Sequence, residues 1–129
     1  MKIFFISLAL SFLNLCIAYA QDYSEQKEIT NKVIQYFEGN QSEDIYNLFD
    51  DTMKSAITVE KLSEIWMSLP LQCGAYLGSG SAVASEIQGM VVVNQLLEFE
   101  TTNLDIRLAF NADKKIGGLF FVPPVKKKE

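Results

Sequence analysis

The sequence predicts an α+β fold, in which N-terminal helices pack on a curved antiparallel sheet of about four strands. Apolar residues recur at three- and four-residue steps in the segments before Pro70, which is the spacing of amphipathic helices. After Pro70 the apolar residues alternate with a period of two and glycine becomes frequent, as is typical of antiparallel strands and their turns. The order of these two patterns places the helices first and the sheet second.

The first 20 residues have the layout of a signal peptide. Lys2 supplies a positive start, residues 3–13 form a mainly apolar run that is too short to span a bilayer, and Ala18-Tyr19-Ala20 has the small-x-small form of a cleavage site. We therefore expect cleavage after Ala20, a periplasmic or secreted location, and no stable membrane insertion once the leader is removed.

Residues 21–123 are predicted to form a single α+β domain. A chain of this length buries enough apolar surface for one hydrophobic core. Pro123-Pro124 ends the last predicted strand, because proline lacks the N–H group that a strand ladder needs. The tail at residues 124–129, which carries Lys126-Lys127-Lys128, is expected to be disordered.

Helix signals divide the first half of this domain. Asp22-Tyr23-Ser24-Glu25 has the spacing of a capping box, and Gly39-Asn40 is a helix stop. Ser42 and Thr58 are the expected N-caps of two further helices, and Pro70 is expected to end the second of them. The predicted helices cover residues 23–38, 42 to about 50, and 58–69.

Strand signals fill the second half. The Gly78-Ser79-Gly80-Ser81 segment matches neither a nucleophile elbow nor a phosphate-binding loop, so it is predicted to be a loop or a bulge in a long bent strand. Residues 111–114, Asn-Ala-Asp-Lys, have the composition of a hairpin turn. The predicted strands cover residues 74–77, 82–88, 90–100, 102–111 and 115–122.

The last predicted strand is apolar on both faces. Alternation puts Ile116 and Phe120 on one side and Leu119 and Phe121 on the other, and the N-terminal helices can cover only one face of the sheet. The simplest cover for the outer face is a second copy of the chain, so we expect a homodimer. The predicted interface residues are Val92, Leu96, Leu119 and Phe121.

Composition excludes several kinds of chemistry. The chain has no histidine, which rules out Ser-His-Asp and Cys-His catalytic groups and histidine-ligated metals. Its net charge of −5 argues against nucleic acid and anionic membrane surfaces as partners. Cys73 is alone once the leader is removed, and it is expected to be a buried small hydrophobe. We predict no catalytic residue, no metal site and no cofactor.

Three segments carry a resemblance to known domains: Ile65-Trp66-Met67-Ser68-Leu69, Cys73-Gly74-Ala75-Tyr76, and the closing residues 115–123. Helices followed by a meander of long strands resemble the cone-shaped fold of nuclear-transport-factor-two-like and cystatin-like domains. The three segments together resemble a bacterial secreted domain of unknown function that often precedes α/β-hydrolase domains. The resemblance implies the fold and an exported location, and it implies no catalytic residues.

A cone of this kind can enclose a pocket between its helices and its sheet. Trp66, Tyr76 and Gln95 interrupt the apolar inward faces, so they are the candidate pocket residues. We expect an exported, non-catalytic domain that binds an envelope protein or a small hydrophobic ligand. The alternative is a small isomerase- or hydratase-like enzyme acting on a hydrophobic ligand in the cone. A side-chain-filled cone would favour the first function, and an open pocket with a carboxylate beside Tyr76 or Tyr46 would favour the second.

Overall fold

The structure is a computed structural model that describes residues 23–125. Helices come first and an antiparallel sheet follows, which confirms the predicted α+β class. The predicted signal peptide and residues 126–129 of the predicted tail lie outside the described residues. The elements are α2 (Ser24–Glu38), α3 (Ser42–Tyr46), α4 (Asp51–Ala56), α5 (Val59–Cys73), β1 (Tyr76–Ile87), β2 (Met90–Phe99), β3 (Leu104–Phe110) and β4 (Ile116–Val122).

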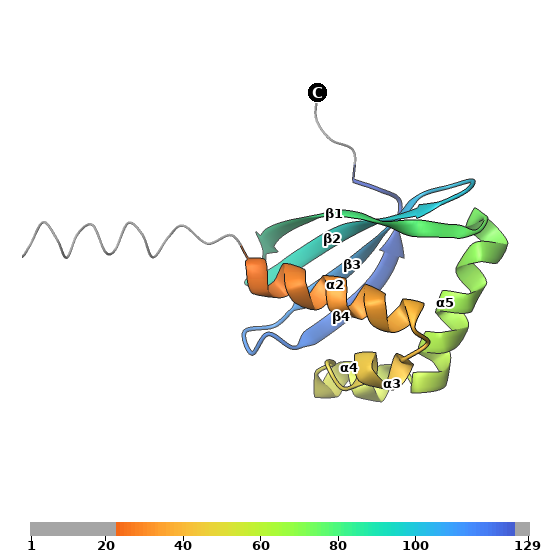
Figure 1. The fold of residues 1–129 in the computed structure, drawn as a ribbon. Coiled ribbons are helices and arrows are strands. Elements are labelled where there is room, and N and C mark those ends of the chain that lie inside the picture. The colour runs from red at the N-terminus through yellow and green to blue at the C-terminus, as the bar shows by residue number, and fades with distance from the viewer. Residues whose placement is uncertain (1–22, 126–129) are drawn as a thin grey trace, which may run out of the picture.

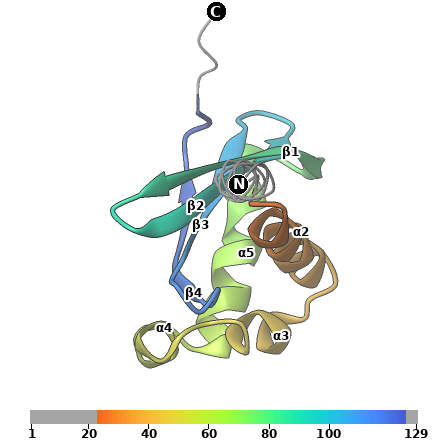
Figure 2. The ribbon, with the colours of Figure 1, turned by 90° about the vertical axis from the view of Figure 1, so that its left-hand side faces the viewer.

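The sheet is a simple meander in the order β1-β2-β3-β4, with every neighbouring pair antiparallel. Its strands curve above the helices, and the views from two directions place α2 and α5 on the same side of it (Figures 1 and 2). We call the sheet face that packs against the helices the inner face and the opposite one the outer face. No helix within residues 23–125 is long and apolar enough to cross a membrane.

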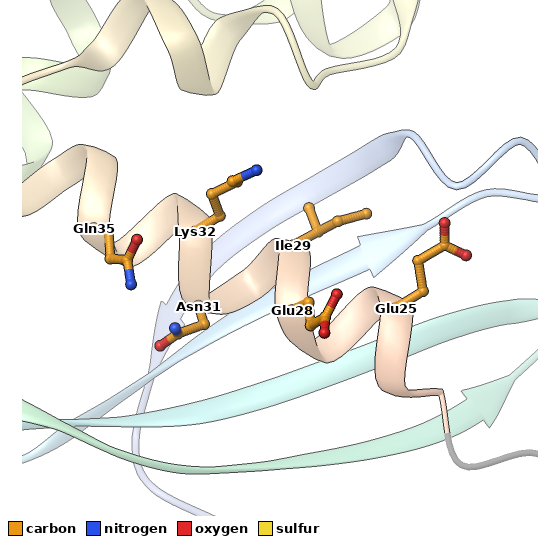
Figure 3. Close-up of a pocket in the computed structure, with 6 residues that line it drawn as sticks. All are labelled: Glu25, Glu28, Ile29, Asn31, Lys32 and Gln35. Carbon is orange, nitrogen blue, oxygen red and sulfur yellow. The ribbon is translucent and has the colours of Figure 1, made fainter.

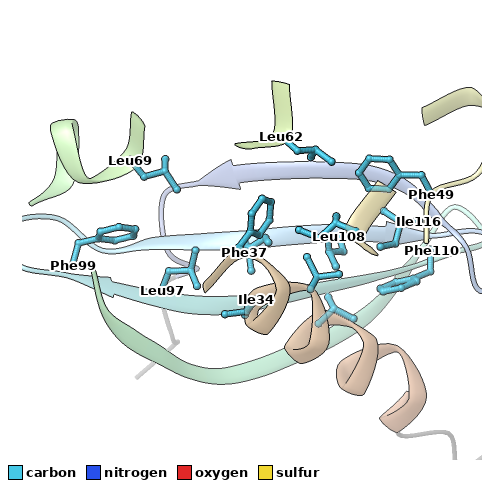
Figure 4. Packing of buried hydrophobic residues seen from close by; sticks show 14 of the residues in the cluster. Ile34, Phe37, Phe49, Leu62, Leu69, Leu97, Phe99, Leu108, Phe110 and Ile116 are labelled. Atoms are coloured by element: carbon cyan, nitrogen blue, oxygen red, sulfur yellow. The ribbon is translucent and has the colours of Figure 1, made fainter. Parts of the chain in front are cut away.

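The core lies between the inner face and the helices. Hydrophobic side chains from both layers interdigitate there, and they fill the space between the sheet and the helices (Figure 4). Cys73 is among them, with 6% of its surface exposed, which confirms the prediction of a buried small hydrophobe. The fully buried side chains of this core include Val33, Ile34, Phe37, Ile45, Phe49, Leu62, Val93, Leu97, Ile106, Leu108, Phe110 and Ile116.

The start of α2 differs from the predicted capping box. Tyr23 is the N-cap residue, in a left-handed conformation with φ of 55°, and its side chain makes no capping hydrogen bond. Asp22 lies outside the described residues. The buried stripe Val33, Ile34 and Phe37 and the stop at Gly39 follow the prediction.

The middle of the helical region differs more. The predicted end of the helix that starts at residue 42 is wrong, because α3 has only 5 residues and Asp50 is the N-cap of α4 rather than the end of α3. The Met53 N–H donates to Asp50 Oδ1 at 2.9 Å, so Asp50 caps α4. Ser42, the predicted cap, is instead the buried first residue of α3, after the N-cap residue Gln41. Aspartate is favoured at a helix start, where it satisfies free N–H groups, which explains why α4 begins here.

In α5 the start is confirmed and the end is corrected. The Lys61 N–H donates to Thr58 Oγ1 at 3.1 Å, as expected for an N-cap threonine. Pro70 lies inside the helix, which continues to Cys73. Proline cannot donate a hydrogen bond, but its carbonyl still accepts one, here from the Gly74 N–H at 3.0 Å. Gly74, with φ of 85°, then ends the helix.

The glycine-rich segment is part of β1, a single strand that replaces the two predicted strands 74–77 and 82–88. The pairing of β1 with β2 shifts register between Tyr76 and Gly78 and again between Ser79 and Ala82, so the predicted bulge is confirmed. After the second shift, the pairing runs without interruption to a two-residue turn.

A bulge in β4 corrects the predicted faces of the last strand. Ile116 pairs with Phe110 and Gly118 pairs with Ala109, so Gly117 is an extra residue. Beyond it, side chains change faces relative to simple alternation from Ile116. Leu119 and Phe121 therefore lie on the inner face and pack against the core, which contradicts their predicted place on the outer face.

Candidate functional site

Two of the predicted pocket residues pack against each other. The Trp66 ring stacks on Phe37 with 4.9 Å between ring centroids, and Tyr76 meets Trp66 edge-on at 5.2 Å. Tyr76 also contacts Phe99, at 5.4 Å between centroids. These rings bring together α2, α5, β1 and β2, so here Trp66 and Tyr76 serve packing.

The hydroxyl of Tyr76 donates a hydrogen bond to Glu38 Oε2 at 2.7 Å. Burial of the ring, together with this bond to a carboxylate, raises the pKa of Tyr76. A carboxylate thus lies beside Tyr76, as the enzyme alternative requires, but the hydrogen bond is at the exposed surface rather than within an enclosed pocket.

Gln95 lies on the inner face of β2 with 5% of its surface exposed. Its Nε2 donates to the Gly80 carbonyl at 3.1 Å and lies 3.4 Å from Asn31 Oδ1. Its Oε1 is buried and has no hydrogen-bond partner within residues 23–125. Gln95 therefore links α2 to β1, and it does not share the Trp66 and Tyr76 contacts.

Two hollows of the described surface are lined mainly by polar residues. One lies along α2, and Figure 3 shows its side chains projecting from successive turns of that helix. The other lies where α3 and α5 begin. Charged and amide side chains dominate both, and neither hollow contains Trp66, Tyr76 or Gln95. The α2 hollow is lined by Glu25, Glu28, Ile29, Asn31, Lys32 and Gln35.

A third hollow, of about 310 Å³, lies on the outer face. Its walls come from β1, β2 and β3 and from the segment that follows β4. We call it the outer-face hollow. It is lined by Ser81, Val83, Asn94, Leu96, Asp105, Pro124 and Val125. Leu96, which the sequence predicts to be an interface residue, is one of them.

A chain of polar contacts crosses the outer face at this hollow. Asp105 Oδ2 accepts from the Val125 N–H at 3.0 Å and from Asn94 Nδ2 at 3.3 Å. Arg107 Nε lies 3.4 Å from Asn94 Oδ1. Asp105 is 5% exposed although it lies on the face away from the helices, because the segment after β4 covers it. Alternation places Asp105 on the outer face, but it gives no sign that the carboxylate is buried.

Apolar side chains surround these polar groups. Val83 and Phe120 are 57% and 53% exposed, and Val125 is 55% exposed. Val92 and Leu96, both predicted interface residues, are half-buried on the same face. Hydrogen-bonding groups at the centre of an exposed apolar surface are the components of a binding surface. Within residues 23–125, no three Cys, Asp or Glu side chains form a group that could hold a metal ion.

Comparison with known proteins gives one family. The family described as "Protein of unknown function (DUF3887)" matches residues 30–119, which run from α2 into β4 and include Asn94, Asp105 and Arg107. Searches of the curated proteins and of the solved structures found no match.

Proposed function

Because the chain belongs to the DUF3887 family, whose function is unknown, we propose a function from its own surface. The domain is a non-catalytic interaction domain, and its outer face binds a second copy of the chain. The observation that carries this proposal is the exposure of Val83 and Phe120 around the polar contacts of Asp105. The inner face, in contrast, is already filled by the core.

The charges of the outer face are suited to a second copy. A two-fold contact places the same surface on both sides, so that surface must be complementary to itself. Arg107 and Glu98 both lie on the outer face, and neither forms a salt bridge within residues 23–125. Two-fold pairing can direct each arginine toward the glutamate of the other copy, while the apolar residues around them are buried.

The enzyme alternative has less support. It needs an enclosed pocket as well as a carboxylate near tyrosine. The Glu38 carboxylate is near Tyr76, but their hydrogen bond is exposed and none of the three hollows above includes Tyr76. A small ligand in the outer-face hollow is a different outcome, and it would leave the chain monomeric.

Sedimentation tests the proposal directly. We expect the purified chain, from residue 21 onward, to sediment well above the mass of one copy, and Leu96→Glu to reduce that mass at least by half. Leu71→Glu is the matched control, because Leu71 is 86% exposed on α5, in the helical layer. A monomeric parent, or a Leu96→Glu variant that sediments as the parent does, would overturn the proposal.

We also propose that the domain works outside the cytoplasm. The charge, apolar run and small-x-small site within residues 1–20 support export, as does the resemblance to secreted domains. Mass spectrometry of the protein from cell fractions tests this proposal. We expect a periplasmic or secreted chain that begins at Gln21, and an intact chain retained in the cytoplasm would contradict it.

A further inference from the structure

The two edges of the sheet are protected to very different degrees. At the β4 edge, the Asp50 N–H donates to the Ile116 carbonyl at 2.9 Å, and the Ile116 N–H donates to the Leu48 carbonyl at 3.0 Å. The Gly117 bulge and Pro123-Pro124 further limit pairing along this edge. Another strand therefore has little access to β4.

The β1 edge has few of these protections. This strand has 12 residues and pairs only with β2 within the described chain. It contains no proline, lysine or arginine, and Glu86 is its single charge. Its bulges lie before Ala82, so the segment from Ala82 to Ile87 is a regular edge. An edge of this kind presents a row of backbone donors and acceptors to another strand.

The turn after β1 determines which backbone N–H and C=O groups of this strand lie on its open edge. Gln88 and Gly89 form a two-residue turn with φ of 52° and 80°. In such a hairpin the flanking residues, here Ile87 and Met90, hydrogen-bond to each other, and every second residue does the same. Val83, Ser85 and Ile87 therefore direct their N–H and C=O groups toward β2. Those of Ala82, Ala84 and Glu86 point to the open side.

We propose that β1 pairs antiparallel with β1 of a second copy, about a two-fold axis at Ser85, to form one continuous sheet of eight strands. In this register Val83 lies opposite Ile87 of the partner subunit. Both side chains are on the outer face and are 57% and 53% exposed in the single chain, so the pairing covers them. These pairs lie between hydrogen-bonded pairs, where side chains on facing strands are closest.

Two features favour a second copy over an unrelated strand. The exposed apolar residues Val83 and Ile87 match each other in this register. Glu86 lies opposite Ala84 of the partner subunit, so no like charges face each other. Only a short segment pairs, so we expect a weak contact that is better detected by cross-linking than by mass.

This inference goes beyond the proposed function, because the hydrogen bonds that it uses lie along the β1 edge and not on the outer face. Val83 borders both contacts, but Leu96 and Phe120 belong to the outer-face contact alone. A variant that removes the outer-face contact should therefore leave the β1 pairing in place.

A single cysteine at the two-fold axis tests the register. In the full chain carrying Cys16→Ser, we expect Ser85→Cys to form a disulfide-linked dimer under mild oxidation, because the two introduced side chains face each other at bonding distance. Ser81→Cys is the matched control: Ser81 is also exposed on β1 but faces Gly89 of the partner subunit in this register. We expect its cross-linking to be at least tenfold slower on a non-reducing gel.

Two second-site variants make the result specific. Adding Ala84→Pro removes an N–H group on the open side and should abolish the Ser85→Cys dimer, with circular dichroism confirming that the domain still folds. Adding Leu96→Glu should leave the dimer intact. Equal cross-linking at Ser81 and Ser85 would overturn the β1 pairing, as would loss of the Ser85→Cys dimer on adding Leu96→Glu. Neither result depends on whether the parent sediments as the proposed function requires.

Discussion

The inner and outer faces of the sheet are made by the same strands and differ in what their side chains do. On the inner face, Val93 and Leu108 are fully buried against the helices. On the outer face, the neighbouring Asn94 and Arg107 contact each other at a surface that solvent reaches. Alternation along a strand thus gives one backbone a buried face and a partly exposed face.

Burial and polarity do not follow this division completely. Asp105 is a buried carboxylate on the outer face, whereas Phe120 is an exposed ring on that face. Gln95 is a buried amide on the inner face. The segment after β4 covers Asp105, α2 approaches Gln95, and Phe120 is left uncovered in the single chain. Substitutions at these positions therefore test how the two faces differ.

The largest expected difference comes from the same substitution on each face. Phe110→Ala removes a fully buried ring from the inner face and should lower the free energy of unfolding by about 3–5 kcal/mol. Phe120→Ala, made in the Leu96→Glu variant so that no second copy covers the ring, removes a side chain that is 53% exposed on the outer face, and its cost should be below about 1 kcal/mol. Urea denaturation of both variants measures the difference. Similar losses would show that the outer face is part of the core.

A smaller difference is expected between the two buried polar side chains. Asp105→Ala leaves the Val125 N–H without its acceptor and should lower stability by about 1–3 kcal/mol. Gln95→Met removes an oxygen that has no partner among residues 23–125, along with two amide contacts, so the net change should stay within about 1 kcal/mol. Denaturation compares the two variants, and amide hydrogen exchange at Val125 should accelerate only in Asp105→Ala. A larger loss from Gln95→Met would reverse this ranking.

The smallest effect concerns the rim of the inner face, where Tyr76 meets Glu38. Burial and the carboxylate raise the pKa of Tyr76, so its neutral form favours the folded state. This contribution to stability is present below the ordinary tyrosine pKa of about 10 and is lost as the pH rises toward the raised value. Tyrosinate absorbance at alkaline pH should show Tyr76 titrating late, and earlier in Glu38→Gln. An unchanged titration in that variant would remove Glu38 as a cause.

Local sequence signals predicted several elements correctly, and the reason is physical. The cap at Thr58 and the alternation in β3 act within a few residues, so their effects are visible in the sequence. The sequence pattern places Asp50 at the wrong helix end, because aspartate also occurs in turns. Pro70 was expected to end α5, but proline close to a helix end removes only one donor and leaves its carbonyl free to accept.

The candidate site was harder to predict. Val92 and Leu96 were placed on the correct face, because no register shift interrupts their pairing with β3. The prediction for Leu119 and Phe121 is wrong, because the extra residue Gly117 reverses the alternation in β4. Nothing in the local sequence indicates that Gly117 forms a bulge. The burial of Asp105 depends on a segment 20 residues away, which no local pattern encodes.

The hydrogen bond between Asp105 and Val125 has a practical consequence for handling the protein. It holds Val125 against the outer face, so an affinity tag or fluorophore attached at Val125→Cys lies beside that face. Immobilisation through such a tag would obstruct the outer face, whereas a fluorophore there would report on its occupancy. Attachment at Met67→Cys, a position 67% exposed on α5 in the helical layer, leaves the outer face clear.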